Sequence, residues 1–158
     1  MIFSPTGIAG TVIPVDRPTL AAADTDSKSA SPAGTAVSQK LSKVLPLPQN
    51  RVSAGMLELD RVLGGGLIRG MVVLLGGDPG IGKSTLLLQA ADTLAGEGVV
   101  LYVSGEESAS QIKLRADRLG MKNDIDILCE TDLEQILDEA NNTRCNVLIV
   151  DSIQTISS

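Results

Sequence analysis

A glycine-rich run with a lysine–serine pair is the strongest chemical signal in this sequence. It follows the pattern G-x-x-x-x-G-K-[S/T] at every position, as Gly77-Asp78-Pro79-Gly80-Ile81-Gly82-Lys83-Ser84. Glycines permit positive φ angles, which let backbone amides approach phosphate oxygens, and a helix that begins at Lys83 adds its unpaired N–H groups. We call residues 77–84 the phosphate loop and expect it to bind the phosphates of ATP.

The polar side chains of this run have distinct expected roles. Lys83 supplies a mobile positive charge for the β- and γ-phosphates, and Ser84 offers a hydroxyl to Mg²⁺. Thr85 can reach the α-phosphate. An empty glycine-rich turn would not need a lysine–serine pair at the helix start, so we prefer a binding role. The expected nucleotide contacts are Gly77, Asp78, Pro79, Gly80, Ile81, Gly82, Lys83, Ser84 and Thr85.

A second acidic signal follows an apolar run. Residues 147–150 are apolar, and Asp151 closes them. A buried parallel strand would deliver this carboxylate to its carboxyl end, where ligands bind in open α/β sheets. With Ser84 opposite, Asp151 is predicted to hold the Mg²⁺ shell through water. Taken alone, an aspartate after a strand is often only a cap for the next turn.

Phosphoryl transfer to water also needs a group that orients the water. Glu106 is the first candidate and Glu107 the second, because both follow an apolar run at residues 99–103. Alternatively, these acids only favour the N-terminus of the next helix. Gln154 is either a γ-phosphate sensor or an ordinary polar loop residue. The predicted catalytic set is therefore Lys83, Glu106 and Glu107.

The elements that must position these groups alternate along the chain. Apolar runs predict strands, and periodic or capped segments predict helices. The expected strands are 71–75, 99–103, 125–128 and 147–150, and the expected helices are 83–95, 108–119 and 132–140. Ser108 is the expected N-cap and Gly120 the expected C-terminal stop of the second helix. This order predicts an α/β fold with a mostly parallel, doubly wound sheet and helices on both faces.

Composition excludes several classes of function. The chain has 158 residues and a formal charge of −6, so it is not a broadly basic nucleic-acid binder. It contains no histidine, which excludes histidine triads and histidine metal sites. Its two cysteines, Cys129 and Cys145, form no zinc-binding spacing, so we expect no zinc site. No apolar run is long enough for a membrane span, and we expect a cytoplasmic protein without a membrane partner.

The chain changes character near residue 50. Six of the seven prolines lie in residues 1–50, where small and polar residues dominate. Such a segment buries too little apolar surface to offset the entropy of ordering it. We therefore expect residues 1–50 to be a disordered, low-complexity tail, and residues 51–158 to be the folded core.

These motifs together resemble RecA-like P-loop ATPases, and most closely the RadA (Sms) family of bacterial DNA repair proteins. The resemblance is carried by residues 53–70, which hold a Leu-Asp pair and a glycine cluster, and by residues 76–88. It is also carried by Leu101-Tyr102-Val103-Ser104-Gly105-Glu106-Glu107-Ser108 and by Val150-Asp151-Ser152-Ile153-Gln154-Thr155. Circadian-clock proteins and replicative helicases share parts of these motifs.

The resemblance implies a DNA-dependent ATPase that uses ATP and Mg²⁺ to drive branch migration of recombination intermediates. Its implied partners are single-stranded or branched DNA and further copies of itself in a homo-oligomeric ring. The resemblance also assigns Lys83, Ser84, Glu106 and Asp151 the roles given above. The family's four-cysteine zinc module, its Lys-Asn-Arg-Phe-Gly motif and its Lon-like domain have no counterpart in this sequence. We therefore expect a C-terminally incomplete core, that is, a fragment.

Two other functions remain open at this point. A RecA-family nucleotide switch of the clock type would oligomerise without acting on DNA, and a partial domain would have no function of its own. Basic residues Lys113, Arg115 and Arg118 on the expected helix 108–119 could face DNA or a neighbouring subunit. A solvated helix face is the preferred interpretation of these three side chains.

Overall fold

The computed structural model of the chain describes residues 8–14, 38, 40–43 and 50–157. The chain divides into two compact units, residues 1–17 with 50–158 and residues 18–49. In the described part, the smaller unit contains the 3-10 helix η1 (Leu41–Lys43). The larger unit contains β1 (Ile8–Pro14), α1 (Leu57–Val62), β2 (Val73–Gly76), α2 (Lys83–Ala95), β3 (Val100–Ser104), α3 (Ala109–Leu119), β4 (Asp126–Cys129), α4 (Leu133–Asn142), β5 (Val147–Asp151) and η2 (Ile153–Thr155).

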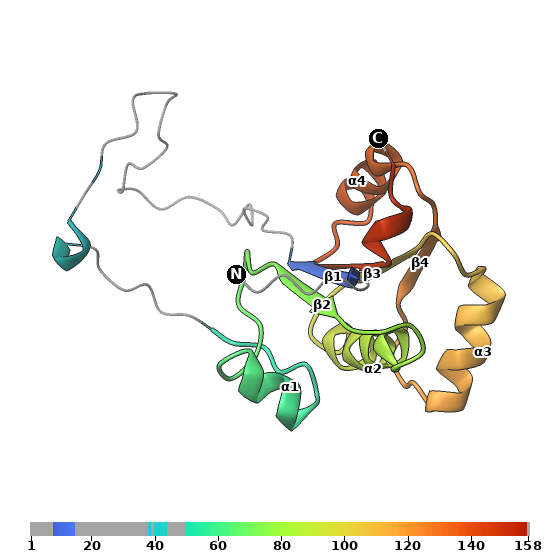
Figure 1. Ribbon diagram of the computed structural model, residues 1–158, viewed down its shortest axis with the longest axis horizontal. Coiled ribbons are helices and arrows are strands. Elements are labelled where there is room, and N and C mark those ends of the chain that lie inside the picture. Colours follow the sequence, from blue (N-terminus) through green and yellow to red (C-terminus); the bar gives the residue numbers. More distant parts are fainter. Residues whose placement is uncertain (1–7, 15–37, 39, 44–49, 158) are drawn as a thin grey trace, which may run out of the picture. The chain divides into compact units, whose positions relative to one another are not determined.

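The strands form one five-stranded sheet in the order β2-β1-β5-β3-β4. Strands β5, β3 and β4 pair in parallel, whereas β1 pairs antiparallel with both β2 and β5 (Figure 1). Because β1 opposes both neighbours, β2 and β5 run in the same direction. The four strands expected from the sequence therefore share one direction, which confirms the predicted mostly parallel sheet.

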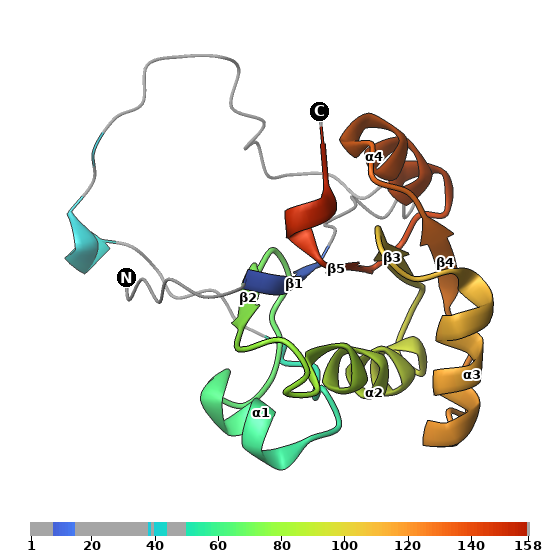
Figure 2. The same cartoon turned by 45° about the vertical axis from the view of Figure 1, so that its right-hand side comes forward.

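Helices cover both faces of the sheet, as Figure 2 shows for α2 and α4. Leu87, Leu88 and Ala91 of α2 and Ile112 of α3 share one buried cluster with Tyr102. The other face has a second buried cluster, formed by residues of α4, β3 and β5 and by one residue between α4 and β5: Leu101, Val103, Ile136, Ala140, Cys145, Leu148 and Val150. Alternate residues of β3 and β5 thus face opposite layers, as the strand repeat requires. The expected α/β arrangement is confirmed.

The N-terminal segment differs from the expected tail. Residues 8–14 form β1, and the remaining described residues of the first fifty are 38, 40–43 and 50. Strand β1 pairs with a neighbour on each side, so its backbone groups have partners along both edges. Composition averaged over fifty residues did not reveal a strand of seven. The rest of the predicted tail lies mostly outside the described residues, and its boundary remains a prediction.

The described helices are short. None of those in the described ranges is both long enough and apolar enough to cross a membrane.

Helix α1, which the sequence did not predict, is held by Asp60, whose carboxylate accepts hydrogen bonds from the Ser53 hydroxyl and the Ala54 amide. These hydrogen bonds, the Ser53 one most strongly, hold the pKa of Asp60 below its ordinary value. The contacts connect α1 to the segment that precedes it.

Candidate functional site

The phosphate loop joins β2 to α2, as the motif requires. Gly82 is the N-cap residue of α2 and has a φ of 103°, and Gly80 has a φ of 80°. Side chains with a Cβ rarely adopt these angles, so glycine is required at both positions by the local backbone. The loop thereby ends at a helix N-terminus, whose free N–H groups attract anions.

Lys83 is folded back over its own loop. Its Nζ donates hydrogen bonds to the backbone oxygens of Gly77, at 2.6 Å, and Asp78, at 2.8 Å. Both acceptors are neutral carbonyls, which hold an ammonium group less strongly than anionic oxygens do. The amine therefore lies within the loop, where it can replace its hydrogen bonds to these carbonyls with contacts to phosphate oxygens.

The strand register brings the loop and Asp151 to one edge of the sheet. Thr11 of β1 pairs with Leu74 on one side and with Val150 on the other. The phosphate loop follows β2 shortly after Leu74, and Asp151 follows Val150 directly. Two strand spacings, about 10 Å, separate the lines of β2 and β5. Ser104, which pairs with Asp151, brings the Glu106 loop to the same edge.

The residues at this edge fit a magnesium nucleotide. An added Cβ at Gly77 would lie 3.2 Å from Ile81 Cγ2, so a larger residue there would fit only if the Ile81 side chain moved by a few tenths of an ångström. Ser84 and Asp151 offer a hydroxyl and a carboxylate, the hard oxygen ligands that Mg²⁺ prefers. Such sites use one or two side chains and complete the metal shell with phosphate and water. The donor set at the edge is consistent with this pattern.

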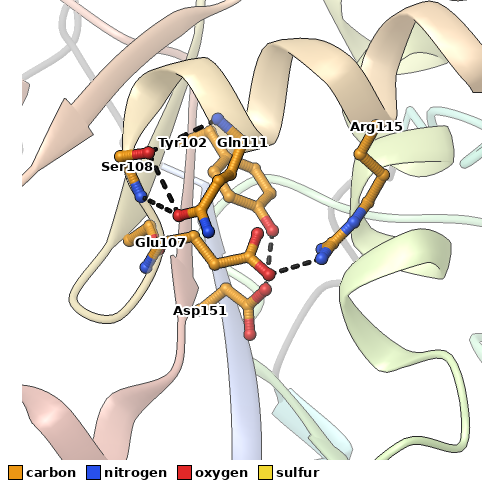
Figure 3. Close-up of polar contacts among 7 residues, drawn as sticks. Tyr102, Glu107, Ser108, Gln111, Arg115 and Asp151 are labelled. Atoms are coloured by element: carbon orange, nitrogen blue, oxygen red, sulfur yellow. Dashed lines mark hydrogen bonds and ion pairs between the residues drawn. The ribbon is translucent and has the colours of Figure 1, made fainter.

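Asp151 has a buried hydrogen-bond donor beside it. The Tyr102 hydroxyl donates to Asp151 Oδ2 at 2.7 Å, although the residues are 49 positions apart (Figure 3). Burial, and secondarily the charge of Asp151, raise the pKa of the Tyr102 phenol above its ordinary value. The phenol therefore keeps its proton and donates. Nothing in the local sequence links Tyr102 to Asp151, so sequence patterns alone predict no role for Tyr102.

The two glutamates after β3 have different surroundings. Glu107 is half-buried and forms an ion pair with Arg115 (Figure 3). Glu106 is exposed, and its Oε1 accepts a long hydrogen bond of 3.4 Å from the Ser152 hydroxyl. A carboxylate that activates water must be free to accept its proton, and an ion-paired one is less available. Of the two glutamates, Glu106 is therefore the one without an ion pair among the described residues, and its role in orienting water remains a prediction.

Arg115 is the clearest departure from the expected solvated helix face. Its guanidinium turns toward Glu107, and its Nη1 is buried without a hydrogen-bond partner in the described part of the chain. Lys113, in contrast, is exposed and pairs with Asp117 one helical turn away. Arg118 is exposed, as expected. The sequence does not show which of these side chains is buried, because burial depends on how the helix packs.

The loop that carries Glu106 packs tightly on the segment after Asp151. A Cβ at Gly105 would lie 2.1 Å from Thr155 Oγ1, so this position accepts only glycine without a shift. Thr155 is fixed in turn by its own hydroxyl, which donates to the Ser152 carbonyl. Gln154 is exposed on η2, and its role as a γ-phosphate sensor remains a prediction.

Comparisons with known proteins show what the chain is similar to. The family described as "AAA domain" matches residues 38–157. "DNA repair protein RadA" of Streptococcus pyogenes serotype M6 is 53% identical over 120 residues, which cover 75% of this chain and 26% of the relative. The protein of the same name from Halalkalibacterium halodurans is 50% identical over 128 residues, covering 80% and 28%. That of Bacillus subtilis is 54% identical over 108 residues, covering 67% and 24%.

The chain spans about a quarter of the length of these curated relatives. The matches confirm the resemblance that the motifs indicated. Together with the parallel strands and the helices on both faces, the family match also confirms the RecA-like P-loop NTPase fold.

Proposed function

Since this chain belongs to the AAA domain family, we propose that it binds ATP with Mg²⁺ at the phosphate loop and hydrolyses it in DNA repair. One observation carries the proposal. The register through Thr11 sets the phosphate loop and Asp151 at the same edge of the sheet, with one strand, β1, between β2 and β5. Lysine and carboxylate at that spacing suit the two ends of a magnesium–triphosphate group.

Each side chain has a part in the proposed reaction. Lys83 binds the β- and γ-phosphates, and the amides at the start of α2 hold the phosphate oxygens in place. Ser84 and, through water, Asp151 would hold Mg²⁺. The bound metal ion would neutralise the charge that develops on the phosphates. Glu106, in the loop after β3, orients the attacking water. Glu107 forms an ion pair with Arg115 and so holds this loop against α3.

The part in DNA repair rests on the relatives. They are named DNA repair proteins, and their identity to this chain is about one half over the core. We propose accordingly that the chain acts in the cytoplasm as part of a ring of identical subunits. Its ATPase would respond to single-stranded or branched DNA and would drive branch migration of recombination intermediates.

Binding of a fluorescent ATP analogue tests the first step. We expect the 158-residue chain to bind it in the presence of Mg²⁺ and Lys83→Ala to weaken binding at least about tenfold, since a charge-assisted contact to phosphate is lost. Lys122→Ala is the matched control, because this exposed lysine follows α3 at the opposite edge of the sheet. Equal binding by wild type and Lys83→Ala would contradict the proposed site.

The DNA step needs a separate measurement. We expect ATP turnover to rise when single-stranded DNA is added and to stay at background in Lys83→Ala. Turnover that is unchanged by single-stranded and branched DNA would contradict the repair role while leaving nucleotide binding intact. Such a result would favour a DNA-independent switch.

A further inference from the structure

We propose that Tyr102 is a positioning residue that fixes the orientation of the Asp151 carboxylate toward the magnesium shell. The inference rests on the proposed function, because it concerns the same site. Its basis is a hydrogen bond of 2.7 Å from the Tyr102 hydroxyl to Asp151 Oδ2. Tyr102 itself is not expected to touch the nucleotide, since it acts through Asp151.

The strand register explains how the phenol reaches the carboxylate. Tyr102 pairs with Ile149 across β3 and β5, and Asp151 lies two residues farther toward the carboxyl edge. A tyrosine side chain is long enough to extend along the sheet over that distance. The ring therefore begins in the core, and its hydroxyl ends at the edge where the phosphate loop lies.

Packing makes this hydroxyl a fixed donor. Only 1% of Tyr102 is exposed, and its ring belongs to the same buried cluster as Leu88 of α2 and Ile112 of α3. A ring enclosed by aliphatic side chains keeps one rotamer, whereas an exposed donor samples several. The hydroxyl can thus hold one carboxylate oxygen in place without a new ordering step when the metal arrives.

The choice of a tyrosine also needs an explanation. It is the one aromatic residue in the folded core of residues 51–158, which otherwise consists of aliphatic side chains. A phenylalanine or leucine would fill the same space without the need for a hydrogen-bond partner. The polar atom is therefore the feature that distinguishes this residue, and its acceptor is the acid that the motif assigns to the metal.

The neighbouring charges leave Asp151 as the acceptor. Glu107 is the other carboxylate that contributes to the electrostatics of Tyr102, and it is already paired with Arg115. Figure 3 shows the side chains of Tyr102, Glu107, Arg115 and Asp151 close together, from β3, the loop after it, α3 and β5. With Oδ2 held by Tyr102, the second oxygen of Asp151 has no hydrogen-bond partner among the described residues. That oxygen is left for a metal-bound water.

Magnesium dependence of nucleotide binding tests the proposal. Tyr102→Phe removes the hydroxyl and keeps the ring, so the fold should persist. We expect the Mg²⁺ concentration for half-maximal binding of a fluorescent ATP analogue to rise about tenfold, as for other groups that orient metal ligands. Binding of the same analogue in EDTA should not change. A purely structural role would instead move both values or neither.

A matched variant and a spectroscopic measurement complete the experiment. Thr143→Val removes a hydroxyl that donates to the Glu139 carbonyl beyond the other end of β5, and it should leave the Mg²⁺ requirement unchanged. The chain has one tyrosine and no tryptophan, so its intrinsic emission reports Tyr102 alone. We expect this emission to change when Mg²⁺ is added to the ATP-bound chain, and Asp151→Asn to abolish that change.

The outcomes separate the two proposals. An equal Mg²⁺ requirement in wild type and Tyr102→Phe, with wild type binding the analogue in a Mg²⁺-dependent way, would overturn the role of Tyr102 and leave the proposed function standing. If the wild-type chain shows no Mg²⁺-dependent nucleotide binding, the proposed function is overturned and this inference with it.

Discussion

Arg115 on α3 forms an ion pair with Glu107, which lies in the loop that leads from β3 into that helix. The pair is half-buried, with 23% and 31% of the two side chains exposed. It therefore ties α3 to the edge of the sheet that carries the proposed site. Glu106, the adjacent residue, is exposed and has no such partner in the described part of the chain.

Neighbouring glutamates should consequently differ in their effect on stability. We expect Glu107→Gln to lower the free energy of unfolding by about 2 kcal/mol, because Arg115 then keeps a partly buried charge without its counter-ion. Glu106→Gln should leave stability within about 0.5 kcal/mol of wild type, as is usual for an exposed residue. Urea unfolding followed by circular dichroism measures both. Similar losses in the two variants would contradict the assignment.

The cap of α3 offers a second stability test. Ser108 and Gln111 form a reciprocal capping box. The Ser108 hydroxyl accepts a hydrogen bond from the backbone N–H of Gln111, and the Gln111 side-chain oxygen accepts one from the backbone N–H of Ser108. Ser108→Ala should cost about 1 kcal/mol, because the first turn loses a hydrogen-bond acceptor. Arg118→Ala, in the last turn of the same helix, changes an exposed residue away from the cap; it is the control and should cost less. Thermal unfolding of the two variants in parallel decides the matter.

Features set by nearby residues were predicted well from the sequence. Ser108 and Gly120 do bound α3, and the phosphate loop does join a strand to a helix, because caps and glycine turns depend on local backbone geometry. Predicted strand ends lie within a few residues of β2 and β3. These signals act over one or two turns of chain, which is the range that a sequence pattern can report.

Pairings between distant residues could not be predicted in the same way. Strand β1 joins residues more than fifty positions away in the chain, and Tyr102 meets Asp151 only after β3 and β5 have paired. Neither partner carries a local mark of the other. Similarly, Arg115 and Lys113 look alike in the sequence, and only the packing of α3 separates the buried cation from the exposed one.

The position of β1 in the sheet makes a direct prediction about the N-terminal segment. Val12 pairs with Val73 on one side and Ile149 on the other. Val12→Pro removes a backbone donor from this central strand and should lower the free energy of unfolding by about 2–3 kcal/mol. Proline there should also weaken ATP binding, because β1 connects the strand of the phosphate loop to that of Asp151.

The control for this substitution keeps the backbone unchanged. Val12→Thr retains both the N–H group and a β-branched side chain, so it should stay close to wild type in stability and in nucleotide binding. If Val12→Pro unfolds at the same urea concentration as Val12→Thr, residues 8–14 do not contribute a paired strand to the sheet in solution. Residues 8–14 lie outside the family match, which begins at residue 38.

Alkaline pH should reveal the buried phenol of Tyr102. Its pKa is raised above the ordinary value of 10.0, chiefly by burial, so the folded chain keeps a proton that the unfolded chain releases. Stability should therefore be unaffected by this group below pH 10.0 and should fall as the pH rises above that value.

Ultraviolet absorbance of tyrosinate follows the titration without interference, because the chain has a single tyrosine. In concentrated urea the tyrosinate should appear near the ordinary pKa, whereas in buffer it should appear only as circular dichroism reports unfolding. Tyr102→Phe should remove this part of the alkaline loss of stability. Tyrosinate that forms near pH 10.0 in a chain that is still folded would show that the phenol is open to solvent and not held against Asp151.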